Sequence, residues 1–245
     1  MKMIALFFLF FSMSFPLFSR EEIIITPETS LIDIPTAGII DYSNFELKTR
    51  FYNNGGILTY MNIGVINNIL NLGASFMIDK IIGSQTPVRM VEPKMQIKFR
   101  FCDGGYYIPA LVLGYDGQGY YYDSRIKKFM QKGKGLYLVG SKEILVGLMG
   151  HMGFNIPDFD DGYLFGFIGV NYNVEDKINI RVEYDNLFHS DYNSRFNFGV
   201  GVNITPNFIV DVALRDVGRN SSFSNGWPEK TERIVQFKTF FYLGD

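Results

Sequence analysis

The chain has 245 residues, of which 16% are aromatic and 20% are charged, and its formal net charge is −2. Because this balance produces no basic field, nucleic-acid binding has no electrostatic support. Cys102 is the sole cysteine, which excludes an internal disulfide and a cysteine-rich metal site. The aromatic share is well above ordinary soluble usage, as expected of a barrel with aromatic girdles.

The N-terminus has the pattern of an export signal. Lys2 supplies a positive charge, and an apolar run from Met3 towards Phe18 follows it, which is the order found in secretory signal peptides. We therefore assign residues 1–19 to a signal peptide, with an uncleaved membrane anchor as the alternative. The remaining sequence contains no apolar stretch of the length that a transmembrane helix needs.

Residues 20–43 contain two prolines and little periodicity, and we interpret them as a lead-in before the barrel. Residues 44–245 contain repeated segments in which apolar and polar residues alternate. The clearest alternation lies in residues 177–203, where Ile178, Ile180, Val182 and Tyr184 face one side, and Asn179, Arg181, Glu183 and Asp185 face the other. A period of two predicts extended strands with one apolar face and one polar face.

The connections between these predicted strands alternate in length. Short turns are expected at 67–68, 103–105, 141–143, 175–176 and 205–207, and longer connections at 79–93, 116–134, 155–161, 187–193 and 217–230. Short turns on one rim and long loops on the other are typical of outer-membrane barrels. The sequence therefore predicts an all-β fold: a closed antiparallel transmembrane β-barrel of about 12 strands. The alternative is a soluble sandwich whose polar face is outside.

Eight short segments occur in an order that matches a known family. They are Thr36-Ala37-Gly38, Phe51-Tyr52-Asn53-Asn54-Gly55-Gly56, Leu72-Gly73-Ala74-Ser75, Ile81-Ile82-Gly83-Ser84, Pro109-Ala110-Leu111, Gly114-Tyr115-Asp116-Gly117-Gln118-Gly119, Ser141-Lys142 and Glu183-Tyr184-Asp185. In this ordered set the chain resembles the YjbH-type outer-membrane β-barrel proteins linked with exopolysaccharide production. The resemblance covers most of residues 36–216. It implies a single-barrel member without catalytic residues, because the chain is too short for the second barrel of larger members.

The polar face of the predicted strands carries charges of both signs and should line the lumen. The set comprises Glu46, Lys48, Arg50, Lys98, Arg100, Arg181, Glu183, Asp185, Arg195, Asp211, Arg215 and Lys238. One hypothesis is a narrow polar conduit or a sugar-binding interior. The other is a self-neutralising network that plugs the lumen, because paired buried charges avoid the desolvation cost of lone ones.

A Gly- and Tyr-rich stretch in the 116–134 connection is a candidate ligand loop. Its candidate residues are Asp116, Gln118, Tyr120 and Tyr122. Aromatic faces beside polar groups suit carbohydrate, whereas an aromatic rim at the membrane interface is the simpler interpretation.

Enzyme chemistry has weak support. His189-Ser190-Asp191 contains the residue types of an acyl-transfer triad, but adjacent residues of an extended loop point in alternating directions. His151 has the polar parity of its segment and is predicted to face the lumen. Two histidines with scattered carboxylates have no metal-ligand spacing, so no metal and no cofactor are predicted.

These patterns predict a non-catalytic barrel that reaches the outer membrane through its signal peptide. The expected partners are outer-membrane lipid and the outer-membrane assembly machinery, with a polysaccharide as the candidate cargo. The first function hypothesis is a component of envelope or exopolysaccharide export or assembly. The alternatives are a structural barrel with a plugged lumen and a lipid-modifying barrel enzyme.

Overall fold

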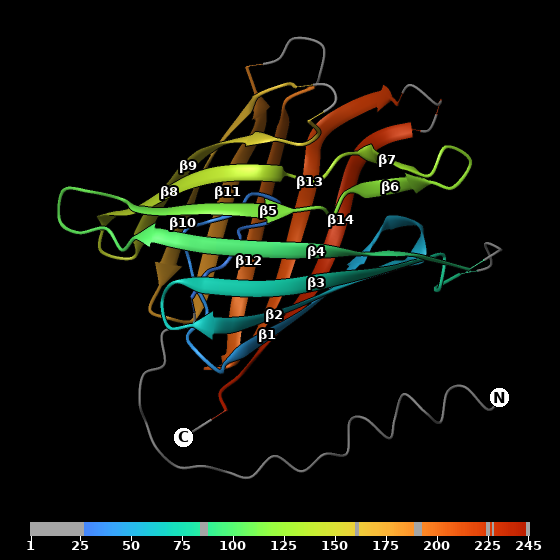
Figure 1. The fold of residues 1–245 in the computed structure, drawn as a ribbon. Helices are drawn as coiled ribbons and strands as arrows, with labels where there is room; N and C mark the ends of the chain where they lie inside the picture. The colour runs from blue at the N-terminus through green and yellow to red at the C-terminus, as the bar shows by residue number, and fades with distance from the viewer. Residues whose placement is uncertain are drawn as a thin grey trace.

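The computed structural model describes residues 27–83, 88–159, 162–188, 193–223, 226 and 228–243. The predicted signal peptide, residues 1–19, lies outside these ranges. In the described part of the chain, twelve strands form one closed antiparallel barrel, and β6 and β7 form a separate hairpin (Figure 1). No helix within these ranges has the length and apolar character needed to cross a bilayer. The predicted fold class is thus confirmed.

The elements follow one another closely along the chain. Their bounds are β1 (Phe45–Tyr52), η1 (Asn53–Gly55), β2 (Gly56–Ile66), β3 (Leu70–Asp79), β4 (Arg89–Cys102), β5 (Ala110–Asp116), β6 (Tyr120–Asp123), β7 (Lys128–Gln131), β8 (Gly135–Leu145), β9 (Leu148–Ile156), β10 (Phe165–Val174), β11 (Ile178–Leu187), β12 (Arg195–Thr205), β13 (Phe208–Ser222) and β14 (Pro228–Phe241). Each barrel strand pairs with its neighbours in sequence, except that β5 pairs with β8 across the inserted β6–β7 hairpin.

The barrel closes where β1 pairs with β14, in a register that runs from Phe45 opposite Phe241 to Phe51 opposite Val235. The Phe45 and Phe241 rings stack at this seam with centroids 4.5 Å apart. Closure gives the backbone groups of the first and last strands partners, which hydrocarbon cannot supply. Because the strand number is even, β1 begins and β14 ends on the same rim.

The two rims differ in the length of their connections. The turn rim carries 67–69, 103–109, 146–147, 175–177 and 206–207, and the loop rim carries 53–55, 80–88, 117–134, 157–164, 188–194 and 223–227. This sorting agrees with the predicted alternation of short and long connections, although the connection at 103–109 is longer than expected.

Three predicted connections are wrong in position or length. The connection expected at 79–93 is shortened, since β4 begins at Arg89. The turn expected at 141–143 lies at 146–147, where Gly147 adopts a φ of +77°. Ser141 is polar because it faces the lumen, not because it lies in a turn. The connection expected at 217–230 is shortened, since β13 runs to Ser222 and β14 starts at Pro228.

The two faces of the barrel wall alternate as a period of two requires. On β4, Met95, Ile97 and Phe99 are exposed on the outside. The intervening Lys98 and Arg100 instead donate hydrogen bonds to backbone oxygens inside the barrel. An exposed apolar outer face around a polar interior is the arrangement of a barrel solvated by lipid.

Replacing Val200 in the middle of β12 with arginine should destabilise the barrel by about 2–4 kcal/mol, because it places a charge in hydrocarbon. The matched control is Thr205→Arg at the exposed end of the same strand, where about 0–1 kcal/mol is expected. Urea unfolding in lipid vesicles measures both. Equal losses at the two positions would show that lipid does not cover this face.

Candidate functional site

The lumen is occupied by residues 28–40, which we call the plug; it runs through the barrel as a blue trace behind the strands (Figure 1). The plug folds as a tight hairpin, with Ser30 bridged to Pro35 and the Leu31 N–H donating to the Ile34 carbonyl at 3.0 Å. The interpretation of residues 20–43 as a lead-in before the barrel is therefore wrong for this segment. Aperiodic sequence looks like a linker, but these residues are ordered by contacts with the wall.

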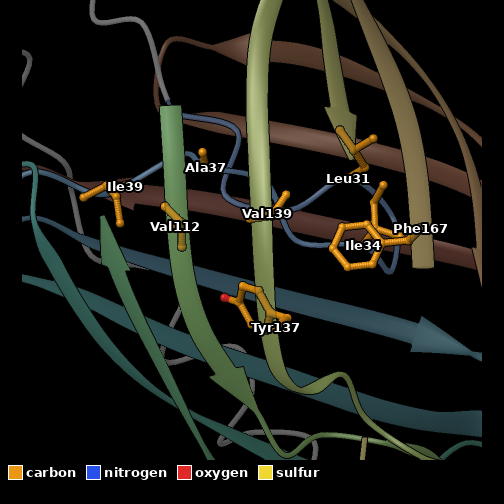
Figure 2. Close-up of a cluster of buried hydrophobic side chains, with 8 residues drawn as sticks. All are labelled: Leu31, Ile34, Ala37, Ile39, Val112, Tyr137, Val139 and Phe167. Carbon is orange, nitrogen blue, oxygen red and sulfur yellow. The ribbon is translucent and has the colours of Figure 1, made fainter. Parts of the chain in front are cut away.

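An apolar cluster holds one side of the plug (Figure 2). Leu31 and Ile34 are buried beside Phe167 of β10, whereas Ala37 and Ile39 lie near Val112 of β5. These wall residues occupy lumen-facing positions that a water-filled channel would not keep apolar. Val112 and Phe167, at the inward parity, were therefore the sequence signal that something apolar fills this side of the barrel.

The tip of the plug is held by one carboxylate of the wall. Glu183 of β11 accepts hydrogen bonds from the backbone N–H groups of Ile32, Asp33 and Ile34, at 3.0, 2.8 and 3.2 Å. Asn197 of β12 donates to the same carboxylate at 2.7 Å. Glu183 thereby satisfies three consecutive backbone donors that the turn itself leaves unpaired.

Asp33 places a carboxylate at the tip between two guanidinium groups. Arg50 of β1 donates to it at 2.9 Å and Arg215 of β13 donates at 2.6 Å. Burial by itself raises the pKa of the Asp33 carboxyl, but the charges of Arg215 and Arg50 outweigh burial and hold the pKa below its usual value. Asp33 is therefore an anion at neutral pH.

Glu28 places a second carboxylate nearer the turn rim. It accepts from Arg181 of β11 at 2.9 Å and from Lys238 of β14 at 2.6 Å. Burial opposes its ionisation, but Arg181 and Lys238 hold the pKa of the Glu28 carboxyl below its usual value. Asp211 of β13 contacts the same two cations, at 2.5 and 3.3 Å.

Three further cations of the wall donate hydrogen bonds to uncharged oxygens of the plug. Lys48 donates to the Ser30 hydroxyl at 2.9 Å, and Arg100 donates to the Ala37 carbonyl at 2.5 Å. Lys98 donates to the carbonyls of Thr29, Thr36 and Gly38. Within the described residues, seven cationic side chains of the barrel thus donate to the plug, and we call them the cationic wall: Lys48, Arg50, Lys98, Arg100, Arg181, Arg215 and Lys238.

The β6–β7 hairpin enters from the loop rim and meets the tip of the plug. The Tyr120 hydroxyl donates to Asp33 at 3.2 Å, and the Arg215 guanidinium lies 3.8 Å from the centroid of the Tyr120 ring. Burial raises the pKa of Tyr120 to about 12, so its hydroxyl is neutral. Gln131 of β7 accepts from Arg215 at 2.8 Å. The lumen is therefore filled from both rims, and Asp33 lies where the two segments meet.

The predicted ligand loop lies mostly inside the barrel, where Asp116, Gln118 and Tyr120 line the cavity described below. Tyr120 is only 8% exposed and Gln118 is 3% exposed, where it accepts from the Ser75 hydroxyl at 2.8 Å. Asp116 ends β5 and accepts from Gln96, and Tyr122 packs against Phe129. An aromatic rim in contact with lipid is therefore not what Tyr120 forms.

All twelve predicted lumen residues face inwards. Besides the cationic wall, Glu46 accepts from the Thr29 hydroxyl, Glu183 holds the plug tip, and Asp185 pairs with Arg195 at 2.7 Å. The plug carboxylates Glu28 and Asp33 were missed. A segment without alternating apolar and polar residues does not show which way its side chains point.

His151 lies in the lumen as predicted. One ring nitrogen lies 2.7 Å from the Ser141 hydroxyl and the other 2.7 Å from the Asn171 side-chain oxygen. The Ser141 oxygen also accepts from the Ala37 N–H at 2.7 Å, so this group supports the plug. His189 lies outside the described residues. In the part of the chain that is described, no three His, Cys, Asp or Glu side chains gather as a metal site would require.

A small cavity of about 70 Å³ remains between the plug and one side of the wall. Lys48, Lys98, Tyr60, Asp116 and Tyr137 are among the residues that line it. Its lining mixes polar and apolar side chains, and its volume corresponds to a few water molecules.

Glycine at position 169 makes room for the plug. A side-chain carbon there would lie 2.5 Å from Ile34 Cδ1 and 2.8 Å from Leu31 Cδ1. Gly169→Leu should displace the plug at a cost of about 1–3 kcal/mol of overpacking, and proteinase K should then cleave the plug in reconstituted protein. Gly105→Leu, where the added carbon meets nothing within 4 Å, is the control. Equal protection in both variants would contradict this seat for the plug.

Comparison with known proteins shows a similar fold but no matching family. No protein-family model matches the chain, and no curated protein matches it. A solved structure described as "KdgM porin in complex with disordered oligogalacturonate" is similar over 81% of this chain and 99% of that chain, with a TM-score of 0.51 and 11% identity. A Rhodopseudomonas blastica porin mutant is similar over 76% of this chain and 55% of that chain, with a TM-score of 0.38 and 8% identity.

Proposed function

We propose that the chain is an outer-membrane barrel that is closed at rest by its own plug, and that it serves envelope or exopolysaccharide export or assembly without catalysis. The observation that carries this proposal is the seating of residues 28–40 in the lumen. The barrel fold, shared with porins, supports the outer membrane as its location. Release of the plug is then the step that allows passage.

The ion pairs of the plug support a closed resting state. Within the described residues, Asp33 and Glu28 each bridge two cations of different strands, at distances between 2.6 and 2.9 Å. Separating one partner of a buried pair costs about 3–5 kcal/mol, because the other charge stays unpaired. Thermal motion alone therefore populates the open state rarely, and a displacing partner is needed.

The polysaccharide part of the proposal has two supports. The first is the resemblance to YjbH-type proteins, which concerns exopolysaccharide production. The second is that the similar KdgM structure is described with oligogalacturonate, an acidic oligosaccharide. We therefore place the candidate cargo among envelope or exported polysaccharides.

Conductance across planar bilayers tests the closed state. The purified wild-type protein should show no steady current, whereas a variant that lacks residues 28–40 should show stable open-channel steps. Successful folding of the variant is checked by its heat-modifiable migration on gels. A steady current through the wild-type protein would overturn the proposal.

A structural barrel with a permanently seated plug is the second candidate, and the same ion pairs favour it. The two candidates differ in whether any ligand opens the wild-type channel. A wild-type protein that stays silent with every envelope polysaccharide, while the deletion variant conducts, would favour the structural role.

A further inference from the structure

We infer that the cationic wall is a binding site for a carboxylate-bearing oligosaccharide, and that the plug occupies this site as an internal mimic of that ligand. The inference rests on the proposed function, since it names the chemistry that displaces the plug. It is carried by the pairing of donors and acceptors between wall and plug.

The wall presents cations and the plug presents oxygens. The seven side chains of the cationic wall donate to two carboxylates, one hydroxyl and several carbonyls of the plug. An acidic sugar chain offers the same set of acceptors, with carboxylates separated by hydroxyl and ring oxygens. Planar guanidinium groups such as Arg50 and Arg215 match a carboxylate in particular, because their fork of N–H donors fits its two oxygens.

The four wall cations that pair with the plug carboxylates are unbalanced without the plug. Among the described residues, Arg50 has an ion pair only with Asp33, and Arg181 and Lys238 share the single wall carboxylate of Asp211. Arg215 retains Glu232 at 2.5 Å. Removing the plug therefore leaves an excess of two positive charges on these four cations, which equals the number of carboxylates that the plug contributes.

This small excess indicates the kind of polyanion. A nucleic acid carries a charge on every phosphate and would meet the wall carboxylates as well as the cations. A neutral sugar would leave two buried cations uncompensated, at the desolvation cost of lone charges. A sugar chain with carboxylates spaced along it compensates the two unpaired cations and does not bring an anion to every wall carboxylate.

An aromatic side chain lies beside another member of the cationic wall. The Lys48 ammonium lies 4.2 Å from the centroid of the Tyr60 ring, and Tyr60 lines the residual cavity together with Lys98. The faces of such rings pack against the apolar faces of sugar rings. This cavity is the place where an entering chain can first contact the wall before the plug leaves.

Titration calorimetry of the detergent-solubilised full-length protein tests the inference with a mannuronate hexamer as the probe. The variant E28Q/D33N weakens the competing plug and should bind the hexamer roughly tenfold more tightly than the wild type, a difference readily measured. The further change R50Q in this variant should remove most of that gain. E92Q/E175Q, which neutralises two exposed carboxylates outside the lumen, is the charge-matched control and should bind as the wild type does.

Bilayer conductance provides the second measurement. The hexamer should elicit current through the silent wild-type protein, and neutral maltohexaose at the same concentration should not. Equal responses to the two sugars, or equal affinities of wild type and E28Q/D33N, would overturn the inference while leaving the closed resting state intact. A wild-type protein that conducts without any sugar would instead overturn the proposed function.

Discussion

Replacing Asp33 with alanine is expected to weaken the seating of the plug by about 3–5 kcal/mol, because it removes one partner of a buried ion-pair group. The substitution leaves the buried guanidinium groups of Arg50 and Arg215 facing each other without the carboxylate between them. The Tyr120 hydroxyl also loses its acceptor. The plug and the β6–β7 hairpin should therefore loosen together.

Proteinase K protection and bilayer conductance measure this loosening. The Asp33→Ala protein should lose protection of residues 28–40 and show intermittent openings. Asp41→Ala, at the exposed position directly after the plug, is the control and should behave as the wild type. Full protection of the plug in Asp33→Ala would mean that the apolar cluster alone holds it.

Replacing Glu183 with alanine should have a comparable effect through the backbone. Three N–H groups of the plug tip lose their acceptor, and each unpaired buried donor costs about 1–3 kcal/mol. The side-chain N–H of Asn197 loses its acceptor as well. Water that enters the widened lumen recovers part of this loss, so several kcal/mol is the expected net change.

Hydrogen exchange of the plug amides measures this second effect directly. The amides of Ile32, Asp33 and Ile34 should exchange faster in Glu183→Ala by orders of magnitude, while those of the barrel strands stay protected. Glu175→Ala, in an exposed turn, supplies the baseline. Unchanged exchange at the tip would show that Glu183 does not hold it.

The two substitutions act on the same tip, and their effects should not add. Asp33 donates its backbone N–H to Glu183 and accepts from Arg50 through its side chain. Once either contact is lost and the tip has moved away, the other contact is already weakened, so its removal costs less free energy. The double variant should therefore lose less than the two single losses combined.

The sequence alone determined the wall of the barrel. A period of two assigns every residue of a strand to one of two faces, so Arg181 and Glu183 could be placed in the lumen without coordinates. The turns could be placed only approximately. Ser141-Lys142-Glu143 has turn composition, but Ser141 faces the lumen, Lys142 and Glu143 lie at the turn rim, and the turn lies at Gly147.

Only the tertiary structure decided what fills the lumen. Residues 28–40 have no period, so nothing local assigns a face to Glu28 or Asp33. Their partners lie far along the chain: Glu183 is 150 positions from Asp33, and Lys238 is 210 from Glu28. In a regular strand, the local alternation of apolar and polar residues predicts which face meets lipid and which face lines the lumen. The plug is ordered instead by contacts that exist only after the barrel has closed around it.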